Sequence, residues 1–146
     1  MQHKKGSVTQ LFISVRGESQ RVKKSFIELD SKGVIEDKFY GKNQQRSILL
    51  TSTSSYVLAK QNGISTPFGS LGENILVDID LYHLVPGEKI QIGSTTLEIT
   101  QNCTICQSLS KVDESLPKLL ESSRGIFAKI INGSTIKKDD TVHLLY

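Results

Sequence analysis

Residues 84–100 read LVPGEKIQIGSTTLEIT, and this stretch carries the clearest fold signal in the chain. Isoleucines alternate with polar residues at 90–92, the pair Gly93-Ser94 follows, and the alternation resumes at 97–99. Apolar residues at every second position on both sides of a short turn are typical of a β-hairpin with one buried face. The stretch therefore predicts two neighbouring antiparallel strands.

Short apolar runs elsewhere extend this β pattern. The run at 126–131, IFAKII, is followed by Asn132-Gly133, a strong hairpin signal because both residues tolerate positive φ. Further runs of strand length alternate with polar loops. They lie at residues 11–15, 26–29, 47–50, 75–79 and 142–145.

Two segments are expected to be helical. Residues 54–62 form the first helix, which Gly63 stops, and residues 116–122 form the second, with Ser115 as its cap and Pro117 in its first turn. Many short strands with two short helices indicate a mainly β fold, either a closed barrel or a sandwich.

Length and composition exclude several classes of protein. The 146 residues fit a single domain over 1–146, on the usual prior of roughly 100–200 residues per domain. A net charge of +3, an aromatic content of 6% and the lack of Trp argue against nucleic acid as a partner. The start MQHKKGSVTQ has no apolar run behind its basic residues, and no stretch approaches the roughly 20 apolar residues of a membrane span. We therefore expect a cytoplasmic protein with no membrane partner.

The two cysteines, Cys103 and Cys106, follow the predicted hairpin as a Cys-x-x-Cys pair. In a reducing cytoplasm they stay thiols. Such a pair fits a redox couple, half of a zinc site, or one working thiolate beside a second cysteine. Zinc needs a second pair of ligands, and the three histidines show no paired spacing. A buried cysteine that only fills space is the alternative without a function.

Two more loops carry unusual sets of polar residues. In residues 33–46, Arg46 stands at the start of a strand, where its guanidinium could clamp an anion in bidentate fashion. In residues 67–75, glycines bend the chain before Glu73 and Asn74, and a loop of this kind lets a ligand approach main-chain amides. From the spacing alone, a solvated loop is the favoured interpretation of residues 33–46 and an ordinary turn that of residues 67–75.

Taken together and in order, these segments resemble the MOSC domain, named for the C-terminal domain of molybdenum cofactor sulfurase. The small stand-alone proteins of that family are the most similar in length, and the resemblance covers nearly the whole chain. The matching segments are GVIEDKFYGK (33–42), RSILL (46–50), GEN (72–74), LVPGEKIQIGSTTLEIT (84–100), QNCTICQSL (101–109) and RGIFAKIINGSTIKKDDTVHLL (124–145).

The chain departs from the family pattern at three places. Tyr40 stands one position late for the aromatic residue or His of the first motif, and Asp139-Asp140 replaces a final Gly-Asp pair, so that a turn glycine is lost. The cysteine loop holds two cysteines where the family has one key cysteine. The tail that begins at Cys106 is similar to the family's C-x-x-L, so we assign the key position to Cys106 and keep Cys103 as the second candidate.

The resemblance implies a closed MOSC-type β-barrel and a molybdenum cofactor of the molybdopterin type. It makes Cys106 the metal-ligating and catalytic thiolate, since a thiolate is a soft ligand that suits molybdenum. Lys42 and Arg46 become candidates for holding the pterin phosphate. Asn74 becomes a candidate for the pterin edge, and Glu73 for the same site or for orienting a loop through main-chain hydrogen bonds. Asp37, in the first motif, completes the candidate cofactor-binding set.

Two functions follow from the resemblance. The first is a small oxidoreductase that reduces N-hydroxylated or N-oxygenated small molecules with electrons from a separate donor protein, because 146 residues leave no room for a flavin or iron–sulfur domain. The alternative is a non-catalytic sulfur carrier, which takes sulfur from a donor protein and delivers it from a cysteine persulfide to a metal–sulfur centre. A plain barrel that binds RNA or protein is a third interpretation. Pyridoxal phosphate is associated with proteins that carry this domain, but no lysine stands in a context that predicts a Schiff base.

Overall fold

The stretch 84–100 forms the predicted hairpin. In the computed structural model, β7 (Lys89–Ile92) pairs antiparallel with β8 (Thr95–Asn102) around Gly93, whose φ is 57°. One face of the hairpin is buried, as the alternation predicts. The buried side chains are those of Ile90, Ile92, Leu97 and Ile99.

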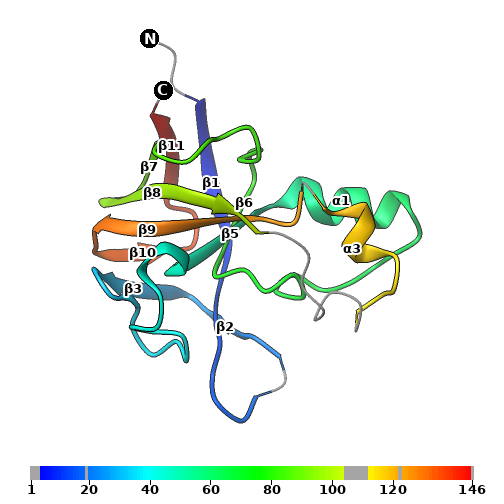
Figure 1. Cartoon of the computed structure of the whole chain (residues 1–146), viewed down its shortest axis with the longest axis horizontal. Coiled ribbons are helices and arrows are strands. Elements are labelled where there is room, and N and C mark those ends of the chain that lie inside the picture. Colours follow the sequence, from blue (N-terminus) through cyan, green and yellow to red (C-terminus); the bar gives the residue numbers. More distant parts are fainter. Residues whose placement is uncertain (1–3, 19, 104–111, 122, 146) are drawn as a thin grey trace.

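The structure describes residues 4–18, 20–103, 112–121 and 123–145. The remaining strands alternate with few helical segments (Figure 1). These strands are β1 (Lys4–Ile13), β2 (Val22–Lys24), β3 (Phe26–Asp30), β4 (Gly33–Val34), β5 (Ile48–Ser52), β6 (Ile75–Val77), β9 (Ile126–Asn132), β10 (Thr135–Lys137) and β11 (Thr141–Leu145). The helical segments are the 3₁₀ turn η1 (Gln44–Arg46), α1 (Thr53–Gln61) and α3 (Leu116–Leu119).

Seven of the described strands close into a barrel, which confirms the predicted fold class. The strand order is β11-β7-β8-β9-β5-β6-β1, and the pairing of β1 with β11 closes the ring (Figure 1). All these pairs are antiparallel except β5 with β6, which run parallel because α1 and a long loop connect them. A closed ring leaves no edge strand within the barrel, so every strand can bury its apolar face inside.

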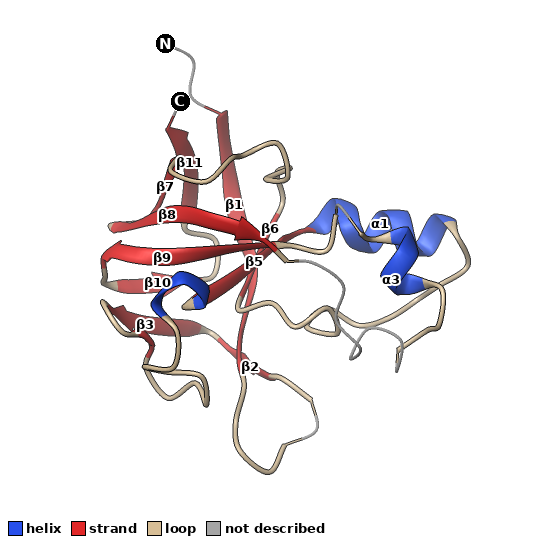
Figure 2. Ribbon diagram, viewed as in Figure 1, coloured by secondary structure: helices blue, strands red, loops and turns tan. Residues whose placement is uncertain are grey.

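The two helices lie together on one side of the barrel (Figure 2). α1 ends at Gln61, one residue before the predicted end, and Gly63 follows it with φ 81° and donates its N–H to the Lys60 carbonyl at 3.0 Å. α3 ends at Leu119, earlier than the predicted end at residue 122, which lies outside the described residues. Within the described ranges, no helix is long and apolar enough to cross a membrane. A second apolar cluster packs under the helices and comprises Tyr56, Ala59, Ile64, Leu71, Leu76, Leu116 and Leu120.

The hairpin predicted at Asn132-Gly133 is wrong. β9 pairs with β5 and β8, whereas β10 leaves the barrel and pairs with β3 in a separate three-stranded sheet. A Cβ at Gly133 would lie 2.3 Å from the carbonyl oxygen of Leu29. Glycine is therefore needed here for the close approach of two backbones, and not for the positive φ of a two-residue turn.

The turn before β11 accommodates the lost glycine. Asp139 has φ 74°, the left-handed conformation that glycine adopts most easily and that Asp and Asn tolerate better than other side chains. Asp140 accepts a hydrogen bond from the Lys137 N–H at 2.8 Å and closes the turn. The chain thus keeps the backbone geometry of a Gly-Asp turn without the glycine.

Candidate functional site

Asn74 joins three segments that are far apart in the sequence. Its side-chain oxygen accepts the Leu49 N–H at 3.1 Å, and its amide nitrogen donates to the Phe12 carbonyl at 3.2 Å and to an Asp37 carboxylate oxygen at 3.3 Å. The residue is only 5% exposed. Because both ends of the amide are engaged, the observed role of Asn74 is to brace these segments, and a contact with a pterin stays a prediction.

Asp37 is the second member of this brace. It is buried, and its carboxylate accepts main-chain N–H groups from Ser14 at 2.7 Å and Phe39 at 3.0 Å. The Arg21 guanidinium lies 3.9 Å from the same carboxylate. The pKa of Arg21 is lowered, chiefly because burial disfavours its charged form. The nearby carboxyl groups of Asp37 and Glu73 favour the charged form and partly offset this effect.

Glu73 lies one residue before Asn74 and is fully buried. Its Oε2 accepts the Tyr56 hydroxyl at 2.6 Å and the Gly69 N–H at 3.1 Å. Among the described residues, Oε1 has no hydrogen-bond partner. The pKa of this carboxyl group is raised because the group is buried. The hydrogen bond from Tyr56 lowers the pKa and offsets part of this rise. The Glu73 side chain therefore holds the loop in place by binding the main-chain N–H of Gly69.

Tyr56 connects this loop to helix α1. Its hydroxyl donates to Glu73 and accepts the N–H groups of Gly69 at 2.9 Å and Leu71 at 3.3 Å. Burial is the main cause that raises the pKa of Tyr56, and the neighbouring Glu73 raises it further. The ring of Phe68 packs edge-on against that of Tyr56 with centroids 4.9 Å apart. The glycine-rich loop is thus a turn, as its glycines predict, and it is anchored to α1 through the Tyr56 hydroxyl.

Arg124 is a site residue that the sequence prediction missed. It is 6% exposed, and its Nε donates to the Leu71 carbonyl at 3.2 Å. Its Nη1 is buried without a hydrogen-bond partner in the described part of the chain. A Cβ at Gly72 would lie 3.3 Å from Nη2, so the glycine leaves room for the guanidinium. One signal could have revealed it: an arginine just before a buried strand, the same placement that singled out Arg46.

Cys103 lies at the end of β8, next to the segment that carries Arg124. Its N–H donates to the Gly125 carbonyl at 2.9 Å, and the residue is buried at 7% exposure. The end of β8 and the start of β9 lie side by side (Figure 1). Cys106, the preferred metal ligand of the sequence prediction, lies outside the described residues.

Arg46 lies on the outer face of the barrel wall. Its guanidinium carbon stacks 4.5 Å from the centre of the Phe127 ring, and Phe127 is paired with Leu49 of β5. The side chain of Asn43 caps η1 by accepting the Gln45 N–H at 3.0 Å, which fixes the start of this turn. Arg46 is exposed and can therefore still bind an anion.

The fold brings some of the predicted site residues into contact and leaves others exposed on the surface. Asp37 and Asn74 are joined by a hydrogen bond, whereas Glu73, the residue next to Asn74, is bonded to Tyr56 and to the Gly69 N–H. Arg124 joins this second group through the Leu71 carbonyl, so the three predicted residues form two adjacent buried hydrogen-bonded groups. Cys103 adjoins Arg124 through Gly125, and Arg46 lies on the same barrel wall. Lys42 lies in an exposed turn, where its N–H donates to the Phe39 carbonyl at 3.1 Å.

The buried guanidinium of Arg124 fits an anionic group. The described residues contain no group of three or more His, Cys, Asp and Glu side chains that could hold a metal ion. The Nη1 of the Arg124 guanidinium has no hydrogen-bond partner among the described residues, and it stands beside the strand end that leads into the cysteine loop. A desolvated cationic donor of this kind stabilises a phosphate strongly.

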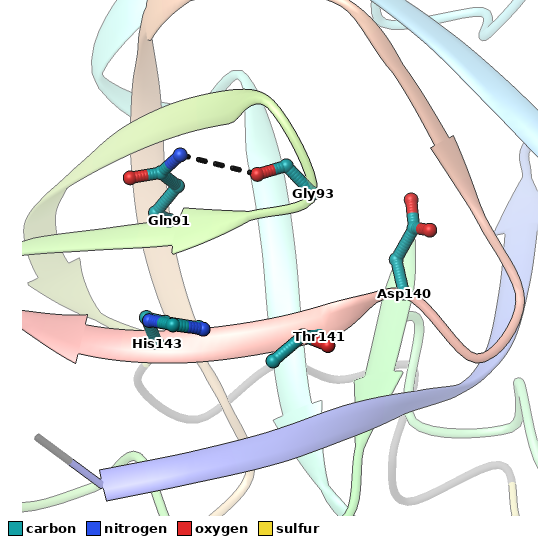
Figure 3. Close-up of a pocket in the computed structure, with 5 residues that line it drawn as sticks. All are labelled: Gln91, Gly93, Asp140, Thr141 and His143. Atoms are coloured by element: carbon teal, nitrogen blue, oxygen red, sulfur yellow. Dashed lines mark hydrogen bonds between the residues drawn. The ribbon is translucent and has the colours of Figure 1, made fainter.

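A separate pocket of about 340 Å³ lies at the turn of the β7–β8 hairpin (Figure 3). The side chain of Gln91 donates to the Gly93 carbonyl at 3.2 Å across its rim. None of the predicted site residues lines this pocket, so it is not the candidate site. Its lining residues are Gln91, Gly93, Asp140, Thr141 and His143.

Comparison with known proteins supports the fold. A family model of the MOSC domain matches residues 36–143. The crystal structure of the YUAD protein from Bacillus subtilis is similar with a TM-score of 0.84 and 17% identity, over 99% of both chains. YiiM from Geobacillus stearothermophilus gives a TM-score of 0.71 at 12% identity, over 97% of this chain and 73% of that one. YiiM from Escherichia coli gives 0.72 at 15% identity, over 98% and 70%. At these identities the structures share the fold, and no curated protein matches the chain.

Proposed function

This chain belongs to the MOSC domain family, and on that premise we propose that it binds the molybdenum cofactor through a cysteine thiolate and reduces N-oxygenated small molecules. The observation that carries the proposal is Arg124, a buried cation with an N–H that no described residue accepts, beside the strand end of Cys103. An anionic ligand at this position would satisfy the arginine.

Each residue of the site has a distinct task in this proposal. Cys106, or Cys103 in its place, binds the metal as a thiolate. Arg124 and the exposed cations Arg46 and Lys42 bind the phosphate. When bound, the cofactor supplies the two-electron redox chemistry. Asp37, Glu73 and Asn74 hold the loops that carry these groups.

The reaction balances with an external electron donor. An N-hydroxylated substrate takes up two electrons and two protons, the N–O bond breaks, an N–H bond forms, and the oxygen leaves as water. A separate donor protein supplies the electrons, and solvent supplies the protons. The cytoplasmic location stays a prediction. So do the expected partners, which are a donor protein and a small-molecule substrate, with no nucleic acid or membrane among them.

The test is a metal and pterin analysis of protein purified from a host that makes the cofactor. We expect molybdenum and pterin in the wild-type protein and their loss in Cys106→Ser. Cys103→Ser is the matched control for the assignment between the two thiols. Unchanged occupancy in both variants would reject thiolate ligation.

The sulfur-carrier alternative rests on one observation, the presence of two cysteines three residues apart in one loop. A neighbouring thiol can resolve a persulfide by attacking its sulfur. Mass spectrometry distinguishes the two functions, because a carrier holds a persulfide on Cys106 or Cys103 without bound metal.

A further inference from the structure

Large apolar side chains are exposed on the turn that follows β4. Ile35 is 39% exposed, Phe39 50% and Tyr40 36%, so that three such residues fall within six positions. Isolated exposed apolar residues are normal on a protein surface, but a local group of them marks an interaction site. Aromatic residues in particular are enriched in protein interfaces.

The turn is held in a defined shape. Gly41 donates its N–H to the Lys32 carbonyl at 2.9 Å, and the Tyr40 hydroxyl donates to the Asp30 carboxylate at 2.5 Å. The Lys38 N–H donates to the Ser14 carbonyl at 2.8 Å, which ties the turn to the barrel. An ordered apolar surface loses little conformational entropy when it binds a partner.

The stretch of chain that carries these apolar residues is basic. The segment 20–46 has seven Lys and Arg and four Asp and Glu, so its net charge equals the +3 of the whole chain. Asp37 lies 3.9 Å from Arg21 and Glu36 lies 3.7 Å from Lys24, so the charges within each of these two pairs offset one another. The other charged residues of the segment are five cations and two carboxylates. The ammonium of Lys38 lies 5.1 Å from the centre of the Phe39 ring. We name Ile35, Lys38, Phe39 and Tyr40 the basic apolar lobe.

The lobe is connected to the candidate site. Asp37, within the same turn, bonds to the buried Asn74 at 3.3 Å. The chain leaves the lobe directly into η1, which carries Arg46. The segment after β3 that carries the lobe, cyan in Figure 1, lies on the side of the barrel away from α1 and α3, so a protein bound to it would approach the barrel rather than the helices.

We propose that the basic apolar lobe is the docking surface for an acidic electron-carrier protein that drives the reduction. This inference rests on the proposed function, which requires an outside donor. Complementary charge steers the encounter of two proteins and raises their association rate, while the apolar centre holds the complex.

The experiment uses the full cofactor-loaded chain and reduced flavodoxin, an acidic flavin carrier, as the probe. Affinity and the second-order rate constant of electron transfer are measured at about 0.01 M and about 0.15 M ionic strength, where the Debye length falls from about 30 to about 8 Å. The double variant Lys38→Glu with Phe39→Ala removes the lobe's charge and apolar contact. Val57→Ala with Lys60→Glu on α1 is the control, because both of its residues are exposed.

We expect the lobe variant to lower affinity and the rate constant by about tenfold or more at low salt, and the control to change them less than about twofold. Equal losses in both variants would overturn the proposal, as would wild-type rates that do not depend on salt. Binding of single-stranded RNA to the lobe, in place of flavodoxin, would also overturn it.

Reduced methyl viologen, a small dye that needs no docking surface, separates the two proposals. Dye-driven reduction should be equal in wild type and lobe variant if only docking is lost. Wild-type protein without dye-driven reduction would reject the proposed function itself.

Discussion

Glu73 is a single residue whose burial has a direct consequence for stability. Burial raises the pKa of its carboxyl group. The folded protein therefore keeps the carboxyl proton to a higher pH than the unfolded chain does, in which a Glu has a pKa of about 4.3. Its contribution to stability is therefore fully present below the unfolded pKa and is lost as pH rises through the folded pKa.

Glu73→Gln removes this titration and keeps the shape of the side chain. We expect the free energy of unfolding of wild type, relative to the variant, to fall as pH rises from about 4 towards the folded pKa. Urea unfolding of both proteins across this range measures the difference. Parallel pH profiles would contradict the predicted shift.

Tyr56→Phe tests the hydroxyl that joins α1 to the glycine-rich loop. The change takes the Tyr56 hydroxyl from the Leu71 N–H and removes one of two partners from Glu73 Oε2 and from the Gly69 N–H, which still bond to each other, so we expect a loss of about 1–3 kcal/mol in the free energy of unfolding. Tyr40→Phe is the matched control, since its hydroxyl bonds to Asp30 at the surface. Equal losses in the two variants would show that the buried network adds nothing.

Arg124 is the residue on which cofactor binding depends most in our proposal. Arg124→Gln removes the cation while keeping a polar side chain, and we expect most of the bound molybdenum and pterin to be lost. Arg124→Lys, which keeps the charge but not the bidentate donors, should retain part of it. Arg16→Gln, at an exposed position, is the control. Full occupancy in a folded Arg124→Gln protein would remove this arginine from the site.

The sequence could group part of these residues but not all of them. Glu73 and Asn74 stand out because they follow glycines before an apolar strand, and Asp37 because it belongs to a motif. Tyr56 and Arg124 reach the site only through the tertiary fold, since α1 and the start of β9 are brought to the loop by the closure of the barrel. Local spacing contains no information on such contacts.

At the scale of elements, the loop at 67–72 depends on the backbone of Gly69. This residue has φ 95°, and a Cβ there would lie 3.0 Å from the Phe12 ring. We expect Gly69→Ala to cost about 1–3 kcal/mol, from the left-handed backbone and the contact together. Gly87→Ala is a matched control, with φ 96° and open space around its Cβ. Equal costs would show that the Phe12 contact is without effect.

The sequence predicts the strands in which apolar and polar residues alternate regularly, but not the short strands outside the barrel. The hairpin at 89–102 follows from its apolar pattern because one face is buried along its whole length. β2 reads VKK and β4 only GV, which is too short for any periodicity. The Asn-Gly pair at 132–133 led to a wrong hairpin prediction. Gly133 is needed because the Leu29 backbone lies too close for a Cβ, and not because a turn needs a positive φ.

At the scale of the whole molecule, the closed barrel fixes where the chemistry can occur. β5, β8 and β9 are neighbours in the ring, so the strand end of Cys103 and the segment of Arg124 are adjacent in space. The predicted barrel is confirmed, whereas the position of the pterin and the choice between the thiols depend on the loop that contains Cys106.

The most direct test of the central claim is the molybdenum and pterin content of the wild-type chain, purified from a host that loads other molybdenum enzymes. Our account predicts that both are present in stoichiometric amounts and are removed together by Cys106→Ser. A folded wild-type protein that carries neither molybdenum nor pterin would contradict it.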